Sequence, residues 1–313
     1  VLMSIISNNI YPLISHTALL MSNIVEIYGE EAITNFDNIL YNLLLDTNTV
    51  SAGIDAMLDI SEKTSNYQLK LEHLQELNRI FSEIPDSDLT ATFLTIILNL
   101  LQNQMLKELY IEFISTEILK FINDNYSNFQ NSSLLYSMCI VITFFEETGD
   151  SELGDFIVFC IQNLRDLTFE GLECFSDDIP FHPGLVASLF ELLDQIDEEE
   201  EESENVVFID EFNCSDIAES TLQKMSEKHR DQVVNIIIEL ISESQNPTQI
   251  LKALCSISSE LKEPENFIQF AIDHLNDESR GEASLFLSQI VDQDNVDQII
   301  SELIPISLDE DNR

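Results

Sequence analysis

Apolar residues recur at spacings of three and four along almost the whole chain. This is the period of an α-helix, and it differs from the period of two that marks a half-buried strand. Ile33, Phe36 and Ile39, for example, fall on one helical face. Only seven glycines and seven prolines interrupt the pattern. The sequence therefore predicts an all-α fold, with helices from residue 11 to residue 306 and no sheet.

The helical period divides into about fifteen segments with a mean spacing of roughly twenty residues. Two helices in about forty residues, joined by short polar connectors, is the spacing of HEAT and armadillo repeats. Each helix pair in such an array buries its apolar stripe against the next pair, so we expect an elongated, right-handed α-solenoid. A non-repetitive helical bundle is the alternative. The stretches 104–124 and 152–175 keep the period unbroken and are predicted as single helices.

The balance of charge restricts the class of partner. The chain holds 13 Lys and Arg against 58 Asp and Glu, which gives a formal net charge of −45. Such a surface repels nucleic acids and anionic membranes, so the charge argues against both as partners. Basic proteins are the expected partners, and a charge that serves solubility alone is the alternative.

The reactive side chains form no recognisable catalytic or metal-binding pattern. The five cysteines are Cys139, Cys160, Cys174, Cys214 and Cys255. Their odd number and scattered positions argue against a disulfide framework and a zinc site, and favour reduced thiols in the cytosol or nucleus. Asp177 and Asp178 lack the spacing of a calcium loop, and His182 and His229 stand in turn-like sequences. We therefore expect neither catalysis nor a cofactor.

No membrane or secretion signal is present in the sequence. No apolar run reaches the roughly 18 residues that a bilayer-spanning helix requires. The N-terminus also lacks the basic segment that precedes the apolar part of a secretory signal, so we expect a soluble protein without membrane insertion. The chain begins with Val1 and not with Met, which leaves open that it is a fragment.

One stretch departs from the helical period: LFELLDQIDEEEEESENVVFIDEF, residues 189–212, in which seven of eight consecutive residues are acidic. Like charges at this density repel each other, so residues 197–205 are predicted as a mobile loop. Helical patterns on both sides tether this loop to the fold, where its negative potential would attract a basic partner. A solvated insertion without a partner is the alternative. The candidate binding residues are Asp197, Glu198, Glu199, Glu200, Glu201, Glu202 and Glu204.

Beyond the acidic run, two segments resemble HEAT repeats. In HLNDESRGEASLFLSQI, the residues at HEAT consensus positions are Leu275, Asp277, Arg280, Ala283, Leu287 and Ile290. We expect Asp277 to cap the helix and to meet Arg280 or another basic residue, while small Ala283 lets helices approach closely. A looser copy, SQNPTQILKALCSIS, places Pro247 in the turn and Lys252 at the usual basic position. The expected solenoid then has N-terminal repeats over 1–195, an acidic loop over 196–212 and further HEAT repeats over 213–313.

The order of these parts, over residues 185–295, resembles the importin-β (karyopherin-β) family of nuclear transport receptors, which carry an acidic loop inside a central HEAT repeat. In that family the loop is commonly followed by Trp, whereas this chain has no Trp and offers Phe208 or Phe212. The resemblance implies a non-enzymatic receptor that binds basic cargo proteins and a Ran-type GTPase in its GTP form. It also implies shuttling between cytoplasm and nucleus through the nuclear pore. Of the family's functional residues, only those of the acidic loop have a match in this chain. The Trp and Asn ladders with which the family binds cargo have no counterpart here.

Two further interpretations stay open. On the family analogy, Phe144 and Phe145 in IVITFFEE would line an apolar groove for Phe-Gly nucleoporins, whereas core packing is the simpler interpretation. A HEAT scaffold subunit of a phosphatase or trafficking complex would use the same solenoid to hold two proteins together. This scaffold is the alternative to a transport receptor.

Overall fold

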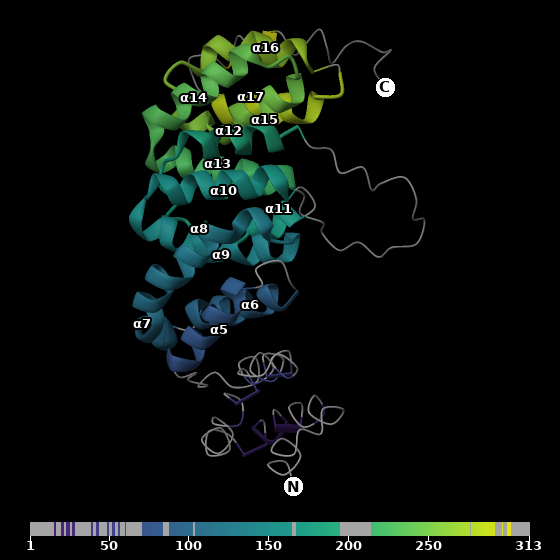
Figure 1. Ribbon diagram of the computed structural model, residues 1–313. Coiled ribbons are helices and arrows are strands. Elements are labelled where there is room, and N and C mark those ends of the chain that lie inside the picture. Colours follow the sequence, from purple (N-terminus) through teal and green to yellow (C-terminus); the bar gives the residue numbers. More distant parts are fainter. Residues whose placement is uncertain are drawn as a thin grey trace, which may run out of the picture. The chain divides into compact units, whose positions relative to one another are not determined.

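The computed structural model describes most of the chain from residue 71 onward (Figure 1). Every regular element among the described residues is a helix, so the predicted all-α fold is confirmed. The contacts divide the chain into two compact units, Val1–Val141 and Ile142–Arg313. The described residues are 71–83, 88–102, 104–164, 167–194, 214–275 and 277–291, with isolated positions before residue 61 and between residues 296 and 301.

The described helices follow one another with short connections. Those of the first unit are α5 (Leu71–Glu83), α6 (Asp88–Gln102), α7 (Gln104–Phe113), the π-helix η1 (Ile114–Ile118), α8 (Leu119–Asn125), the 3-10 helix η2 (Tyr126–Asn128) and the first part of α9 (Asn131–Thr148). In the second unit α9 is followed by α10 (Ser151–Asn163), α11 (Thr168–Leu172), α12 (Pro183–Leu192), α13 (Cys214–Lys228), α14 (Arg230–Glu243), α15 (Pro247–Ser256), η5 (Ser258–Glu260), η6 (Pro264–Phe267), α16 (Ile268–Asp273) and α17 (Arg280–Ile290).

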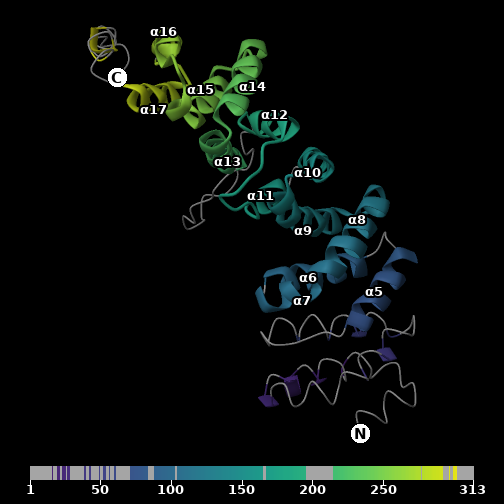
Figure 2. The ribbon, with the colours of Figure 1, turned by 90° about the vertical axis from the view of Figure 1, so that its left-hand side faces the viewer.

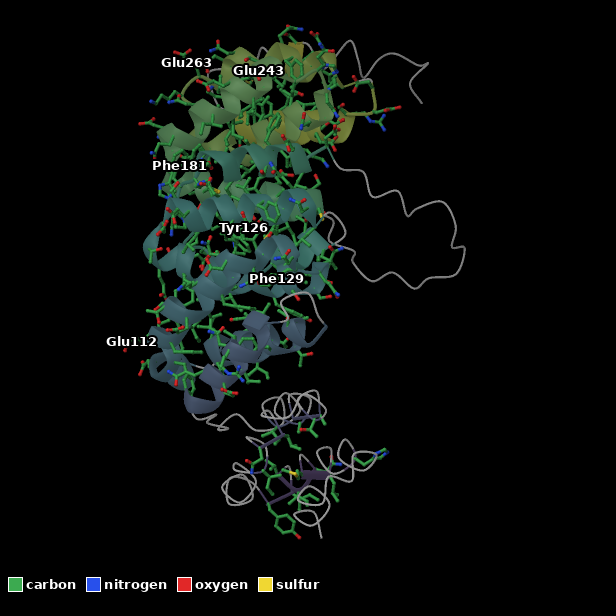
Figure 3. The ribbon with its side chains drawn as sticks, viewed as in Figure 1. Glu112, Tyr126, Phe129, Phe181, Glu243 and Glu263 are labelled. Atoms are coloured by element: carbon green, nitrogen blue, oxygen red, sulfur yellow. The ribbon has the colours of Figure 1, made fainter. Side chains whose placement is uncertain are left out.

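Aromatic side chains connect the helices of the first unit. The Phe93 ring of α6 meets the Phe121 ring of α8 edge to face, with ring centroids 6.4 Å apart. Phe121 in turn lies 5.6 Å from Phe129, measured between centroids, where the chain leaves η2 (Figure 3). All three rings are buried. Aromatic pairs at these separations stabilise a core beyond the area that they bury.

The stretch 104–124 is helical throughout, as predicted, and contains one π-turn. Helices α7, η1 and α8 follow each other without a break, and η1 widens the turn at Ile114–Ile118. The hydroxyls of Ser115 and Thr116 both donate to the carbonyl oxygen of Glu112, at 3.1 and 2.8 Å. The Glu112 carbonyl therefore accepts two side-chain hydrogen bonds at the point where the backbone bonds change from the α-helical to the π-helical pattern.

The prediction of a single helix over 152–175 is wrong, because α10 ends at Asn163 and α11 begins at Thr168. Thr168 is fully buried, and its hydroxyl donates to the carbonyl oxygen of Leu164 at 2.7 Å. That bond satisfies a carbonyl at the end of α10 from outside the helix, and so stabilises the turn. Apolar spacing does not reveal the turn, since Leu164 and Leu172 are buried on either side of it.

The helices of the second unit contact one another in two rows. Helices α10, α12 and α14 pack in succession in one row, and α11, α13, α15 and α17 pack in succession in the other. The two rows can be followed in Figure 2. Helices of different rows also meet, as in the pairs α12 with α13 and α13 with α14. Each helix therefore packs mainly against its neighbours along the row and those opposite.

The apolar positions predicted for the last HEAT-like segment lie in the core of the second unit. Leu275, Ala283, Leu287 and Ile290 are buried in one cluster that joins α15, α16 and α17. Phe286 is fully buried in the same cluster. Ala283 has no exposed surface, and its small side chain lets α17 pack closely on α15. Phe144 and Phe145 are also buried, which favours their interpretation as core residues.

The expectation that Asp277 caps α17 is wrong, because the N-cap residue is Ser279 and makes no side-chain capping bond, while Asp277 lies in the preceding turn and has His274 as its side-chain partner. The Asp277 carboxylate accepts a hydrogen bond from the backbone N–H of Ser279 at 2.9 Å and lies 2.5 Å from Nδ1 of His274. The hydrogen bond with His274 is the main reason that the pKa of the Asp277 carboxyl is below its ordinary value. Arg280 meets Asp277 through the backbone, where its N–H donates to the Asp277 carbonyl at 3.3 Å.

Phe286→Ala should lower the free energy of unfolding by about 3–5 kcal/mol, because it removes a fully buried ring and leaves a cavity. Urea denaturation followed by circular dichroism measures the change. Leu285→Ala is the matched control, since Leu285 is adjacent and 47% exposed. The control should change the free energy of unfolding by no more than about 0.5 kcal/mol. Equal losses in the two variants would contradict the assignment of Phe286 to the core.

Candidate acidic interface

The predicted acidic loop, 196–212, lies outside the described residues. The structure describes the helices on either side of this segment, because α12 ends at Leu192 and α13 begins at Cys214. The candidate interface is therefore built from the surroundings of the segment. The predicted site residues that fall outside the description are Asp197, Glu198, Glu199, Glu200, Glu201, Glu202 and Glu204.

A network of hydrogen bonds joins the two places where this segment begins and ends. The Ser215 hydroxyl, at the start of α13, donates to the carbonyl oxygen of Leu193, just after α12, at 3.3 Å. Lys252 of α15 donates from Nζ to the Ser215 hydroxyl oxygen at 2.8 Å. Gln249 of α15 donates to the carbonyl oxygen of Phe190 at 3.0 Å. The segment therefore starts and ends at one place, on two helices that pack together and against α15.

Glu219 of α13 lies within electrostatic reach of the Lys252 ammonium group on α15 and of two further carboxylates, one from α13 and one from α17. We call Asp216, Glu219 and Glu282 the acidic row. Burial is the largest influence on Glu219 and raises its pKa above the ordinary value. The positive charge of Lys252 opposes this shift, whereas the negative charges of Asp216 and Glu282 add to it. Three carboxylates against one ammonium give this part of the surface a negative charge.

The other cations in the stretch 214–275 form ion pairs that connect different elements. The pairs are Lys224–Asp177 at 2.8 Å, Lys228–Asp178, Arg230–Glu260 at 3.1 Å and Lys262–Asp231 at 2.9 Å. Exposed pairs of this kind contribute only about 0–1 kcal/mol each. Their larger effect is that each of these Lys and Arg side chains already has a carboxylate partner. The stretch holds ten acidic residues against five Lys and Arg, so carboxylates remain in excess.

His182 begins α12 from a buried position, where the sequence predicts only a turn. Its Nδ1 accepts a hydrogen bond from the backbone N–H of Leu185 at 3.2 Å, and its Nε2 lies 3.3 Å from Asp155. The Phe145 ring packs edge to face on the imidazole. A Cβ added to Gly154 would lie 2.5 Å from Cδ2 of His182, so glycine makes room for the ring. The position of His182, directly before a proline at the start of a helix, was the available signal.

Two buried cysteines, Cys160 and Cys255, are the thiols with raised pKa values among the described residues. No group of His, Cys, Asp and Glu in the described part of the chain could hold a metal ion. Burial raises the pKa of Cys255 to about 12, with contributions from Glu219 and Glu282, and burial also raises the pKa of Cys160. Both thiols therefore stay protonated at neutral pH and are poor nucleophiles. No helix among the described residues is long and apolar enough to cross a membrane.

No model of a known protein family and no curated protein matches this chain. Its function must therefore be argued from the acidic row, the ion pairs and the motifs of the sequence. Sequence reasoning missed the bond from Lys252 to Ser215, because its partners lie 37 residues apart. The available signal was the position of Lys252 in the HEAT-like segment.

Gly154→Ala should lower the free energy of unfolding by about 1–3 kcal/mol, because the new methyl group forces the His182 ring to shift. Gly281→Ala is the matched control, since an added Cβ there meets no atom within 4 Å. The control lies in α17 and should raise the free energy of unfolding by about 0.5–1 kcal/mol through helix propensity. Thermal denaturation measures whether Gly154→Ala lowers the stability and Gly281→Ala raises it. A stable Gly154→Ala variant would show that the His182 ring is not confined.

Glu219→Gln should raise the free energy of unfolding at pH 7, by less than about 1 kcal/mol because the side chain is half-exposed. The pKa of Glu219 is raised by folding, so its ionisation destabilises the folded state as pH rises through that pKa. The gain of the variant should therefore disappear at a pH below the ordinary pKa of glutamate, where Glu219 is neutral in both states. Urea denaturation across this pH range measures it, with exposed Glu239→Gln as control. A gain that grows on acidification would contradict the assigned cause.

Proposed function

We propose that this chain is a non-enzymatic nuclear transport receptor of the importin type, which binds basic cargo proteins and a Ran-type GTPase. The observation that carries the proposal is the excess of carboxylates around Glu219 on α13, the helix at which the acidic segment ends. Basic segments are the ligands that such a surface attracts.

The proposal includes an α-solenoid of HEAT repeats. Support comes from the second unit, where helices in two rows pack mainly against their neighbours, as the members of a repeat array do. The apolar cluster that joins α15, α16 and α17 also supports the proposal, because neighbouring helices of a repeat array bury their apolar residues against each other in this way. A solenoid presents one row of helices along a continuous surface, and the acidic row lies on helices of a single row.

Affinity in this proposal comes from many weak ion pairs that act together. Each exposed pair with Lys or Arg contributes about 0.2–1 kcal/mol. Screening at physiological salt limits the reach of each charge to about 8 Å. Binding should therefore weaken steeply as salt concentration rises. Four cations of the second unit already form internal ion pairs, so a cation of the partner is favoured as the counter-charge for the acidic row. The four are Lys224, Lys228, Arg230 and Lys262.

The role of the GTPase rests on the resemblance to the importin-β family. In the proposal the GTP form of a Ran-type protein competes with basic cargo for the acidic surface, and Phe-Gly nucleoporins carry the receptor between cytoplasm and nucleus. A HEAT scaffold subunit of a phosphatase or trafficking complex is the rival function. A pull-down with GTP-loaded and GDP-loaded Ran separates the two, because a scaffold should not distinguish the nucleotides.

Replacing Glu198, Glu199, Glu200, Glu201 and Glu202 together by Gln should weaken the binding of basic cargo by at least about tenfold at low salt, because five charge interactions are lost. Fluorescence anisotropy with a labelled basic peptide measures the affinity. The substitution keeps side-chain size and removes only charge, so it isolates the electrostatic contribution.

The matched control removes the same number of charges elsewhere in the second unit. It replaces five exposed glutamates on α14, beside η6 and before α17 by Gln, and Glu243 and Glu263 among them are labelled in Figure 3. The five are Glu239, Glu243, Glu263, Glu265 and Glu278. Equal affinity of the two variants for the peptide would mean that the acidic segment is a solvated insertion and not a binding site.

A further inference from the structure

The connection between α11 and α12, residues 173–182, is a strap that three further helices hold in place. Glu146 of α9 accepts hydrogen bonds from the backbone N–H and the hydroxyl of Ser176, at 2.7 and 2.9 Å. Two carboxylates of the strap form ion pairs with α13, which are Asp177–Lys224 and Asp178–Lys228. At the end of the strap, Nε2 of His182 lies 3.3 Å from Asp155 of α10. The strap therefore depends on polar contacts with α9, α10 and α13.

Two histidines at this strap are the N-cap residues of helices in one row, His182 of α12 and His229 of α14. His182 caps its helix, because its Nδ1 accepts the backbone N–H of Leu185 at 3.2 Å, and this nitrogen therefore carries no proton. His229 makes no side-chain capping bond. Its Nε2 lies 3.2 Å from the carbonyl oxygen of Ile179, which can only accept, so this nitrogen is a donor.

A second ring proton has different consequences for the two histidines. On His182 the proton occupies Nδ1, which then can no longer accept the N–H of Leu185. The positive charge would lie at the N-terminus of α12, where the helix dipole disfavours a cation. It would also be buried, because His182 is 5% exposed and packs on the Phe145 ring. On His229 the Nε2–H donor remains, so its bond to the strap survives protonation.

Asp155 is the one charged group among the described residues that pairs with the His182 ring. Its carboxylate favours the protonated ring, but its side chain is 75% exposed, so the attraction is weak. Charged groups on the other helices around the strap and α12 have partners elsewhere, and they are Glu146, Lys224, Lys228, Arg230, Asp231 and Lys252. Glu219 of α13 has a raised pKa, mainly through burial, so it also gains a proton more readily than an ordinary glutamate. A measurement of the acid response must therefore distinguish His182 from Glu219.

We propose that His182 is an acid-sensitive switch, which opens the first turn of α12 and frees the end of the strap when the ring takes up a second proton. The open form exposes Nδ1 to solvent, so it binds this proton more readily than the closed form. Opening should therefore increase as pH falls through the range of about 8 to 5, in which histidine ordinarily changes charge. The inference does not depend on the proposed function. It adds a response to acidity at α12, the helix after which the acidic segment begins.

Helix α15 has the same arrangement with a cap that does not titrate. Both helices begin with a proline, and the N-cap residue of α15 is Asn246. The Asn246 side chain accepts the backbone N–H of Gln249 at 3.3 Å, and Gln249 holds the same position in α15 as Leu185 in α12. An amide oxygen accepts this bond at any pH in the range of histidine titration. His182→Asn would therefore give α12 the cap of α15.

Hydrogen exchange of backbone amides, followed by NMR on the full chain at about pH 7.5 and about pH 5.5, tests the proposal across the range of histidine titration. Protection is expressed relative to the intrinsic exchange rate at each pH. Protection of the Leu185 N–H should fall about three- to tenfold on acidification, the effect of losing one N-cap bond. Protection of the Gln249 N–H should change by less than about twofold, because its cap does not titrate. The ring nitrogen signals at the higher pH should show the proton of His182 on Nε2.

Three variants assign the response to a residue. His182→Asn should reduce the change in Leu185 protection between the two pH values to less than about twofold. His229→Asn is the matched control, because it replaces the other N-cap histidine, and it should keep the full response. Glu219→Gln should also keep the response, which separates His182 from Glu219. Comparison of the two pH values within each variant cancels any loss of protection that the smaller Asn side chain causes at both.

Several outcomes would overturn the proposal. These are unchanged protection of Leu185 in the parent chain, an equal fall in His182→Asn, and a proton on Nδ1 of His182 at the higher pH. Loss of the response in His229→Asn or Glu219→Gln, while His182→Asn still responds, would assign the switch to the other residue. If His182→Asn does not fold, the parent chain decides the question. Nδ1 of His182 must then gain its proton over the same pH range in which Leu185 loses protection.

Discussion

The burial of a single apolar stripe on each helix, against the helices beside and opposite it, is the interaction on which the second unit depends. Leu251, Leu254 and Phe286 are fully buried in this way between α15 and α17. The buried part differs between helices, and α14 buries only Val233 and Ile237, so its other positions are free to be polar. The chain can therefore carry a large excess of acidic residues without placing carboxylates in its core.

The distribution of the few cations follows from the same arrangement. Lys and Arg in the stretch 214–275 connect elements that are far apart in sequence, as Lys228 and Asp178 do across 50 residues. Lys252 has a different environment, because it donates to Ser215 and its charge acts on Glu219, which the charges of Asp216 and Glu282 also affect. The Lys and Arg residues of this stretch thus neutralise carboxylates at contacts between elements, whereas carboxylates outnumber the single ammonium group around Glu219. The proposed interface takes its position from this local excess.

The helices and much of the core could be predicted from the sequence, because apolar spacing directly reflects which side of a helix is buried. Leu275, Ala283 and Leu287 lie where this spacing predicts. The turn between α10 and α11 could not be predicted, since the Thr168 hydroxyl and the Leu167 N–H both donate to the Leu164 carbonyl there while the apolar period continues. The candidate site was predicted only as a run of acids. Its described surroundings, which are the hydrogen bonds that join Lys252, Ser215 and Leu193, depend on contacts between residues distant in sequence, and a local pattern does not encode them.

The hydrogen bond from Ser215 to Leu193 makes the helix pair α12 and α13 a natural position for inserted sequence. Packing of the two helices already brings the ends of the intervening segment together, so the length of the segment contributes little to folding. For a flexible connection, each doubling of length costs only about 0.6 kcal/mol. A fluorescent domain or an affinity tag could therefore be inserted between α12 and α13, and it would report on the proposed interface from its edge while both helices keep their contacts.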